Sequence, residues 1–145
     1  MEEKILDIST GDAPSGVSLE GKKILWIEDD EFLSSIITQR LAKEKSIVIS
    51  GTRGEDVVEL AGHEMPDIIM LDILLPGMDG MEVLAKLKSN EKTKHIPVIV
   101  FSNFDDKTKI EQSKSLGAAG FFVKASINLD EIVNEIKKAI STHPA

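Results

Sequence analysis

The fold is decided by the stretch Pro66–Gly80, which reads PDIIMLDILLPGMDG. Its segment Ile68–Leu71 is continuously apolar, and this pattern predicts a strand buried on both faces of a sheet. The strand ends on a carboxylate, Asp72, and a loop with proline and glycine then leads to a helix expected to begin at Gly80. Taken alone, Asp72 is best explained as a residue that caps a turn. However, open α/β sheets place their ligand chemistry at this end of a strand.

The composition is that of one ordinary globular domain, with 145 residues of which 41% are hydrophobic and 29% are charged. No apolar run approaches the ~20 residues of a membrane span, and the first residues do not resemble a secretory signal. The chain has no Cys, which excludes disulfide and thiolate chemistry and favours a cytoplasmic location. A net charge of −8, no Tyr and one Trp argue against direct binding of nucleic acid.

The chain divides into two segments by composition. Residues 1–21 show no sustained period and contain the turn-rich sequence GDAPSG, so we expect a mostly mobile leader or linker. The alternative is a short strand or helix that packs on the domain. Residues 22–142 are expected to form the folded domain. We expect either a stand-alone protein or a domain cut from a larger one.

Strand and helix patterns alternate five times within the folded domain. Short apolar runs predict strands over residues 22–27, 47–49, 68–71, 97–101 and 121–123. Apolar residues at helical spacing predict helices over residues 33–41, 54–61, 80–88, 105–116 and 128–140. This alternation predicts an α/β fold with a parallel sheet and helices on both faces.

Chemically useful side chains follow four of the expected strands: Glu28, Asp29, Asp72, Ser102 and Lys124. Because the carboxyl ends of parallel strands meet at one edge of a sheet, we expect these side chains to converge. Clustered carboxylates repel one another unless a cation intervenes, and hard oxygen ligands suit Mg²⁺. One carboxylate could attack phosphorus, while an ammonium and a hydroxyl stabilise the phosphoryl oxygens. For Ser102 taken alone, an ordinary Ser after a strand is an equally good explanation.

Four motifs together resemble the receiver domain of two-component response regulators. They are WIEDD from Trp26, LPGMDG after Asp72, the pair Phe101-Ser102, and GFFVK ending at Lys124. The resemblance extends over about residues 22–140. It implies a doubly wound, flavodoxin-like fold with five parallel strands in the order 2-1-3-4-5 and five helices. It also implies a signalling phosphoacceptor that catalyses only its own phosphorylation and dephosphorylation.

The resemblance implies a role for each residue of the cluster. Asp72 matches the phosphoacceptor. The implied Mg²⁺ ligands are Asp29, Asp72 and the backbone carbonyl of Leu74, with Glu28 acting through water. Ser102, Lys124 and Phe121 match the residues that bind the phosphoryl group and switch the conformation. The implied phosphoryl donor is a histidine kinase or a histidine phosphotransfer protein, and the downstream partner is an unknown protein.

The chain departs from the family pattern near the expected site. Ala125 follows Lys124 where the family usually has a Pro in a cis bond, which is costly before Ala. Phe121 stands at the switch position that is often Tyr and offers no hydroxyl. Asn103 is larger than the usual residue after Ser102, so we expect it to narrow the entrance to the site.

Two further side chains are expected to control access to the phosphoryl group. Leu74 lies two residues after Asp72, and Phe104 lies two residues after Ser102. Both are apolar, so we expect them to exclude the attacking water and to slow the loss of the phosphoryl group. The alternative is that they pack on each other and leave the entrance open.

Two other classes of function remain open from the sequence. A small Mg²⁺-dependent phosphatase could also use an Asp nucleophile, but such enzymes commonly carry a second Asp two residues on, where this chain has Leu74. A phosphorylation-independent interaction module could share the same fold. The complete set of acidic residues argues against such a module, whereas the missing Pro and Tyr favour it weakly.

Overall fold

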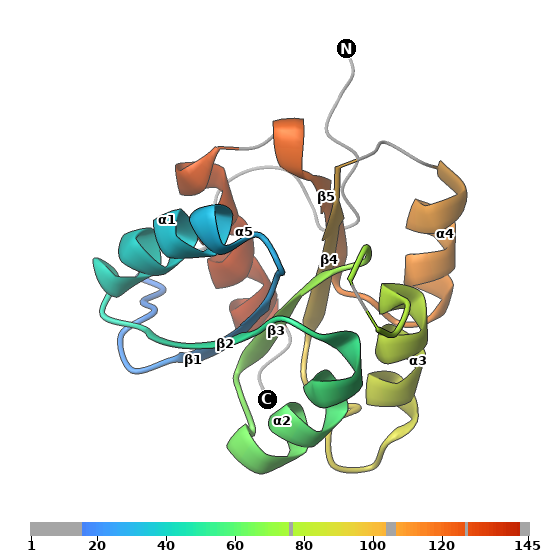
Figure 1. Ribbon diagram of the computed structural model, residues 1–145. Helices are drawn as coiled ribbons and strands as arrows, with labels where there is room; N and C mark the ends of the chain where they lie inside the picture. Colours follow the sequence, from blue (N-terminus) through green and yellow to red (C-terminus); the bar gives the residue numbers. More distant parts are fainter. Residues whose placement is uncertain (1–15, 76, 104–106, 127, 143–145) are drawn as a thin grey trace.

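The computed structural model describes residues 16–75, 77–103, 107–126 and 128–142 (Figure 1). Its centre is a sheet of five parallel strands in the order β2-β1-β3-β4-β5, as the sequence predicted. The strands are β1 (Lys23–Ile27), β2 (Ile47–Gly51), β3 (Ile68–Asp72), β4 (Val98–Ser102) and β5 (Gly120–Val123).

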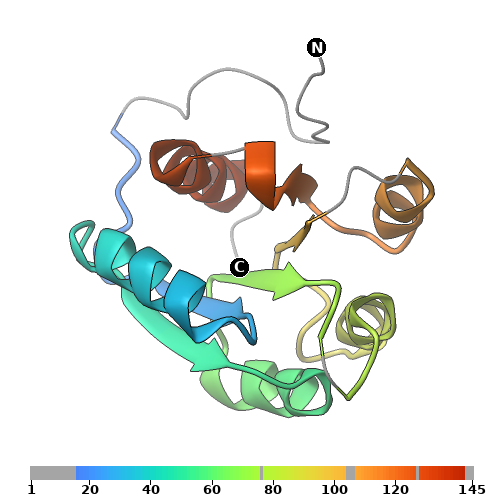
Figure 2. The same ribbon diagram turned by 45° about the horizontal axis from the view of Figure 1, so that its top comes forward.

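Five α-helices alternate with the strands, so the expected doubly wound α/β fold is confirmed. They are α1 (Glu31–Ala42), α2 (Val57–Glu64), α3 (Gly80–Ser89), α4 (Lys107–Ser115) and α5 (Leu129–Thr142). Two short 3₁₀ helices, η1 (Gly54–Asp56) and η2 (Lys124–Ser126), precede α2 and α5. Helices α1 and α5 cover one face of the sheet, and α2, α3 and α4 cover the other (Figure 2).

The two faces of the sheet bury alternate residues of each strand. On β1, Leu25 and Ile27 pack toward α2 and α3, whereas Ile24 and Trp26 pack toward α1 and α5. This alternation is the period of two of a pleated strand. Every residue of β3, β4 and β5 is buried, as their apolar sequences require, whereas the edge strand β2 is only half-buried.

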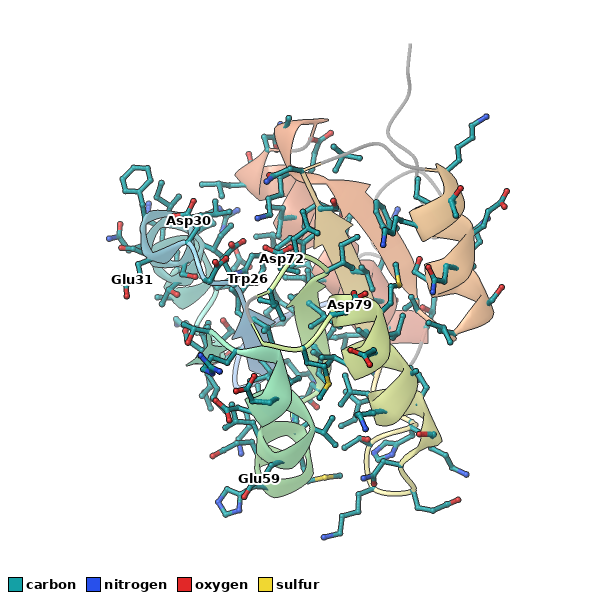
Figure 3. The ribbon with its side chains drawn as sticks, turned by 45° about the vertical axis from the view of Figure 1, so that its right-hand side comes forward. Trp26, Asp30, Glu31, Glu59, Asp72 and Asp79 are labelled. Carbon is teal, nitrogen blue, oxygen red and sulfur yellow. The ribbon has the colours of Figure 1, made fainter. Side chains whose placement is uncertain are left out.

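Side-chain caps begin three of the helices and explain where the chain turns. Asp30 accepts a hydrogen bond from the Leu33 N–H at 3.1 Å and begins α1, and Asp79 begins α3 in the same way (Figure 3). At α5 the side chains of Asn128 and Glu131 form a capping box. The Asn128 side chain accepts from the Glu131 N–H at 2.9 Å, and the Glu131 carboxylate accepts from the Asn128 N–H at 2.8 Å.

The second helix differs from its prediction, because the chain first forms η1 and enters α2 only at Val57. Gly54 at the start of η1 lies tightly against the loop after β3. A Cβ at Gly54 would lie 2.6 Å from the carbonyl oxygen of Met78, so only a residue without a side chain fits. This contact holds the loop after Asp72 against the rest of the domain.

The amino-terminal segment enters the core before the expected boundary. Leu19 is completely buried and packs in the cluster between α1, α5 and the sheet. The N–H of Gly21 donates to the Lys45 carbonyl at 2.9 Å, which ties this segment to the turn before β2. We therefore propose that the packed domain begins near Leu19 rather than at Lys22. Residues 1–15 of the expected leader lie outside the described residues.

Across the described ranges, none of the helices combines the length and the apolar character that a membrane crossing needs.

Candidate functional site

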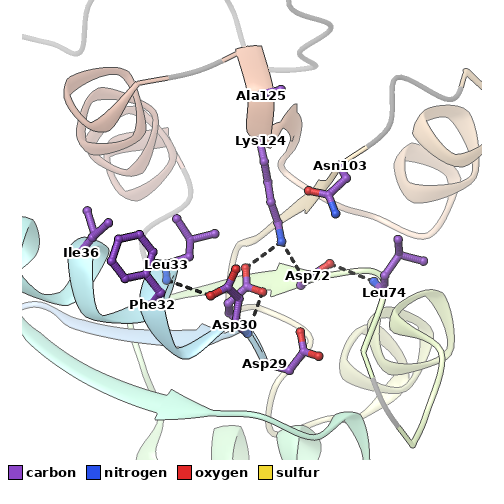
Figure 4. A pocket seen from close by; sticks show the side chains of 11 residues that line it. Asp29, Asp30, Phe32, Leu33, Ile36, Asp72, Leu74, Asn103, Lys124 and Ala125 are labelled. Atoms are coloured by element: carbon purple, nitrogen blue, oxygen red, sulfur yellow. Dashed lines mark hydrogen bonds and ion pairs between the residues drawn. The ribbon is translucent and has the colours of Figure 1, made fainter.

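The carboxyl ends of β1, β3 and β5 bring four of the predicted site residues together (Figure 4). Strands β1 and β3 are neighbours in register, with Ile27 beside Leu71, so the residues that follow each of them are adjacent. One carboxylate oxygen from each of Glu28, Asp29 and Asp72 lies within 4.8 Å of the others. The structure thus forms the acidic cluster that the sequence predicted.

Lys124 reaches into this cluster from the end of β5. Its Nζ lies 2.9 Å from Glu28 Oε1 and donates a hydrogen bond to Asp72 Oδ2 at 3.0 Å (Figure 4). The side chains of Glu28 and Asp72 are only 1% and 4% exposed, and that of Lys124 is 16% exposed. Lys124 is therefore the countercharge to two buried carboxylates. Its ammonium also lies 5.3 Å from the centre of the Phe101 ring.

Burial and charge shift the pKa values of both Glu28 and Lys124, and only the shift of Lys124 favours the charged form. Burial raises the pKa of Glu28, and the Asp72 charge raises it further, although contact with the Lys124 ammonium opposes both effects. Burial alone would lower the pKa of Lys124, but its contacts with Glu28 and Asp72 outweigh burial and raise that pKa above its ordinary value. Lys124 is thus held as a cation.

The backbone holds the carboxylates in a defined orientation. The Leu74 N–H donates to Asp72 Oδ1 at 2.9 Å, so both oxygens of Asp72 have a partner. The Asp30 N–H donates to Glu28 Oε2 at 3.2 Å. Asp29, by contrast, is an exposed residue, and its carboxylate completes the cluster from the solvent side.

The cluster suits a divalent cation. Three carboxylates face one ammonium, so a cation with two positive charges would balance the charge of the cluster. Oxygen ligands with an open, solvent-facing side are what Mg²⁺ requires, because this ion keeps several of its waters.

The predicted switch residues lie deeper in the domain. Ser102 ends β4, is 2% exposed and lies in register beside Val123, the residue before Lys124. Phe121 is completely buried, and its side chain packs in the cluster on the side of α2, α3 and α4. The Lys124–Ala125 peptide, for which a cis bond was in question, is trans.

The acidic cluster lies in an open cavity of about 650 Å³. Leu74 and Asn103, two of the residues predicted to control access, line this cavity, and Ala125 lines it as well (Figure 4). The Leu74 side chain is 48% exposed. Phe104 lies outside the described residues, so the exclusion of water by Leu74 and Phe104 stays a prediction.

Sequence reasoning missed one part of this cavity, the apolar wall formed by α1. Phe32 lines the cavity and is 77% exposed, and Leu33 and Ile36 line it as well. Leu33 and Ile36 are among the apolar residues at helical spacing that predicted this helix and its buried stripe, and both are only half-buried. The available signal was Phe32 itself, an aromatic residue outside that stripe and directly after four acidic residues.

The fold and the cluster together define the class of protein: a receiver-type phosphoacceptor domain, with carboxylates and a lysine at the edge of a 2-1-3-4-5 parallel sheet. The chain belongs to the response regulator receiver domain family, whose family model matches residues 24–137.

Characterised relatives agree with this assignment. The chain is 34% identical over 102 residues to the response regulator PleD of Caulobacter vibrioides, and this match covers 70% of the chain but only 22% of PleD. It is 31% identical over 117 residues to sporulation initiation phosphotransferase F of Bacillus subtilis, covering 81% of the chain and 92% of that protein. The crystal structure of the phosphorylated cyanobacterial phytochrome response regulator RcpA superimposes with a TM-score of 0.67 at 32% identity, covering 83% of this chain and 91% of RcpA.

Proposed function

We propose that this receiver domain accepts a phosphoryl group on Asp72 from a histidine kinase or a histidine phosphotransfer protein in the cytoplasm. The phosphorylated domain then changes its contacts with a downstream protein. The observation that carries the proposal is the pairing of buried Asp72 with Lys124 at the centre of the acidic cluster. Similarity to a sporulation phosphotransferase and to a regulator crystallised in its phosphorylated form supports it.

In the proposed transfer, an oxygen of Asp72 attacks the phosphorus of a phosphohistidine. The new oxygen–phosphorus bond forms as the phosphorus–nitrogen bond breaks, and the electron pair of that bond returns to the imidazole of the donor. The Leu74 N–H, at 2.9 Å from Asp72 Oδ1, fixes the orientation of the nucleophile. Lys124, already at 3.0 Å, is placed to stabilise the negative charge that arrives with the phosphoryl group.

The same proposal assigns the acidic cluster to Mg²⁺. Asp29, Asp72 and the Leu74 carbonyl would bind the ion directly, and Glu28 would bind through water. When bound, Mg²⁺ supplies positive charge that neutralises the phosphoryl oxygens. The exposure of Asp29 supports this arrangement, because it leaves room for metal-bound waters, whereas Glu28 is already held by Lys124 and the Asp30 N–H.

We propose that Ser102 and Phe121 convert phosphorylation into a conformational change. Ser102 is positioned beside the end of β5 and next to the strand that carries Asp72. A hydrogen bond from its hydroxyl to the phosphoryl group would shift the loop after β4, and the buried Phe121 ring would repack in response. Leu74 and Asn103 would limit the access of water to the phosphoryl group.

The test is the intact mass of the protein after incubation with acetyl phosphate and Mg²⁺. We expect one added phosphoryl group that is stable in acid and labile in base in the wild type, and none in Asp72→Asn. Asp79→Asn is the matched control, because Asn replaces an Asp of the same loop at a helix cap that either residue can form. Labelling that survives in Asp72→Asn would remove Asp72 from the proposed role.

Two further measurements distinguish the two other classes of function. Steady hydrolysis of a generic phosphate ester would indicate a phosphatase instead. Partner binding that is unchanged by Asp72→Ala would indicate an interaction module that works without phosphorylation.

A further inference from the structure

The position of Leu74 depends on the loop after β3, which is described for residues 73–75 and 77–79 and which we call the β3–α3 loop. The Leu74 N–H donates to Asp72 Oδ1 at 2.9 Å, and the Leu74 carbonyl is the proposed backbone ligand of the metal. The Leu74 side chain is 48% exposed, so its own packing does little to fix the backbone beside it. The neighbouring parts of the loop must therefore position both groups.

The loop is anchored on both sides of Leu74. At its base, the Gly80 N–H donates to the Ile73 carbonyl at 3.1 Å. Toward its tip, Leu75 and Met78 pack against the core cluster on the side of α2, α3 and α4. The close approach of Gly54 to the Met78 carbonyl also brings η1 into contact with the backbone of the loop.

A charged pair on the connection between β2 and α2 closes over the loop at Gly77. This residue has a φ of +90°, and a Cβ added to it would overlap a carboxylate oxygen of Glu55. The Glu55 carboxylate therefore lies directly against the Gly77 backbone. Arg53 holds that carboxylate by donating a hydrogen bond from Nε at 2.9 Å and another from Nη2. Only a residue without a side chain fits at Gly77 beneath this pair.

Stability alone does not explain the pair. The side chains of Arg53 and Glu55 are 53% and 42% exposed. Ion pairs that face water in this way contribute little to the free energy of unfolding, because the solvent screens them. What the pair provides is a carboxylate in a fixed place above the tip of the loop.

We propose that Arg53 and Glu55 are positioning residues, which act through Gly77 to hold the Leu74 backbone where Asp72 and a metal ion need it. Neither residue lines the cavity of the acidic cluster, so they act through the loop and not by direct contact. Groups that orient a ligand from outside the coordination shell commonly set the affinity for the metal. The metal part of this inference rests on the function proposed above, whereas the part that concerns the Leu74 N–H does not.

The first test is the rate of hydrogen exchange at the Leu74 N–H, measured by NMR on the full chain without metal. Glu55→Ala should speed this exchange about threefold or more, because the loop opens more often. The Lys23 N–H is the internal reference, since it also donates to a carboxylate, Asp67 Oδ2 at 2.8 Å, but at the start of β1. An unchanged rate at Leu74, or an equal increase at Lys23, would overturn the proposal. This result does not depend on the function proposed for Asp72.

The second test is Mg²⁺ affinity, measured by quenching of Trp26 fluorescence. Glu55→Ala should lower this affinity about three- to tenfold. Glu55→Gln keeps an oxygen acceptor for Arg53 and should stay within about twofold of the wild type, although it loses the same charge. Glu59→Ala is the matched control, because it removes one negative charge from an exposed residue of α2 that lies apart from the β3–α3 loop (Figure 3).

Each outcome of the affinity measurement decides a different part of the inference. Equal affinity of Glu55→Ala and wild type, or an equal loss in Glu55→Gln or Glu59→Ala, would overturn the positioning role of Glu55. A wild type that binds no Mg²⁺ would overturn the metal part together with the magnesium assignment, and the exchange test would still decide the rest.

A double variant tests whether Arg53 acts through Glu55. Arg53→Met should lower Mg²⁺ affinity, and combining it with Glu55→Ala should lower it no further than Glu55→Ala alone. Single effects that multiply in the double variant would show that Arg53 acts independently and would overturn this order of action.

Discussion

Replacing Lys124 by Met tests whether this residue is the countercharge of the acidic cluster. Its Nζ lies 2.9 Å and 3.0 Å from oxygens of Glu28 and Asp72, whose side chains are almost completely buried. At an effective dielectric constant of about 20, each pair is worth about 5 kcal/mol before the cost of desolvation. Removing one partner of a buried pair typically costs about 3–5 kcal/mol. Since Lys124 is 16% exposed, we expect the lower value, about 3 kcal/mol of unfolding free energy.

Thermal unfolding with and without Mg²⁺ measures this loss. Without metal, Lys124→Met should unfold about 6–12 °C below the wild type. Saturating Mg²⁺ should stabilise Lys124→Met more than the wild type, because three carboxylates then face no other cation in the cluster. The control is Lys137→Met, which removes a surface contact to Glu44 of 3.4 Å and should cost less than about 1 kcal/mol, with no added response to Mg²⁺.

Two results would refute this reasoning. The first is a Lys124→Met variant that unfolds at the wild-type temperature in the absence of metal. The second is an equal stabilisation of Lys124→Met and wild type by Mg²⁺, which would mean that Lys124 does not compensate the charge of the metal-binding carboxylates.

Three further predictions concern the metal, the switch and the lifetime of the phosphoryl group. Asp29→Ala should lower Mg²⁺ affinity about tenfold or more, and Glu28→Gln should lower it less, as measured by quenching of Trp26 fluorescence. Equal Mg²⁺ affinity of Asp29→Ala and wild type would contradict the assignment of Asp29 as a direct metal ligand. Ser102→Ala should still accept the phosphoryl group, but it should lose the NMR shifts that the phosphoryl mimic beryllofluoride induces in the wild type at residues away from the site. If Ser102→Ala keeps those shifts, the conformational coupling does not run through the Ser102 hydroxyl. Leu74→Asn should speed the first-order loss of the phosphoryl group several-fold, corresponding to ~1 kcal/mol of barrier, because it removes the half-exposed apolar side chain that excludes water. An unchanged rate would show that Leu74 does not shield the phosphoryl group.

The order and type of the elements were predictable because they depend on local patterns. The unbroken apolar run Ile68–Leu71 identified the central strand, which the structure buries completely. The loop with proline and glycine marked the start of the helix at Gly80, where α3 does begin. The helix predicted over residues 128–140 begins with the capping box of Asn128 and Glu131. Once five strands were known to be parallel, their carboxyl ends had to share one edge, so the convergence of Asp72 and Lys124 followed as well.

Features that depend on contacts between distant segments could not be predicted in this way. Leu19 lies in a segment without any period, yet it is buried because α1, α5 and the sheet leave room for it. Phe32 was not recognised as part of the site, because its exposure beside the acidic cluster depends on where α1 lies above the sheet.

The sequence by itself therefore determined the parallel sheet, its central strand and the residues available at its carboxyl edge, because periodicity and turn chemistry are properties of neighbouring residues. Only the tertiary structure decided which of those residues touch. The ion pairs of Lys124 join residues that are 52 or more positions apart in the chain. The buried rings of Trp26, Phe101 and Phe122, which pack on one another, come from three different strands. Such contacts depend on how closely side chains from distant parts of the chain pack, and no pattern of neighbouring residues encodes the distance between those side chains.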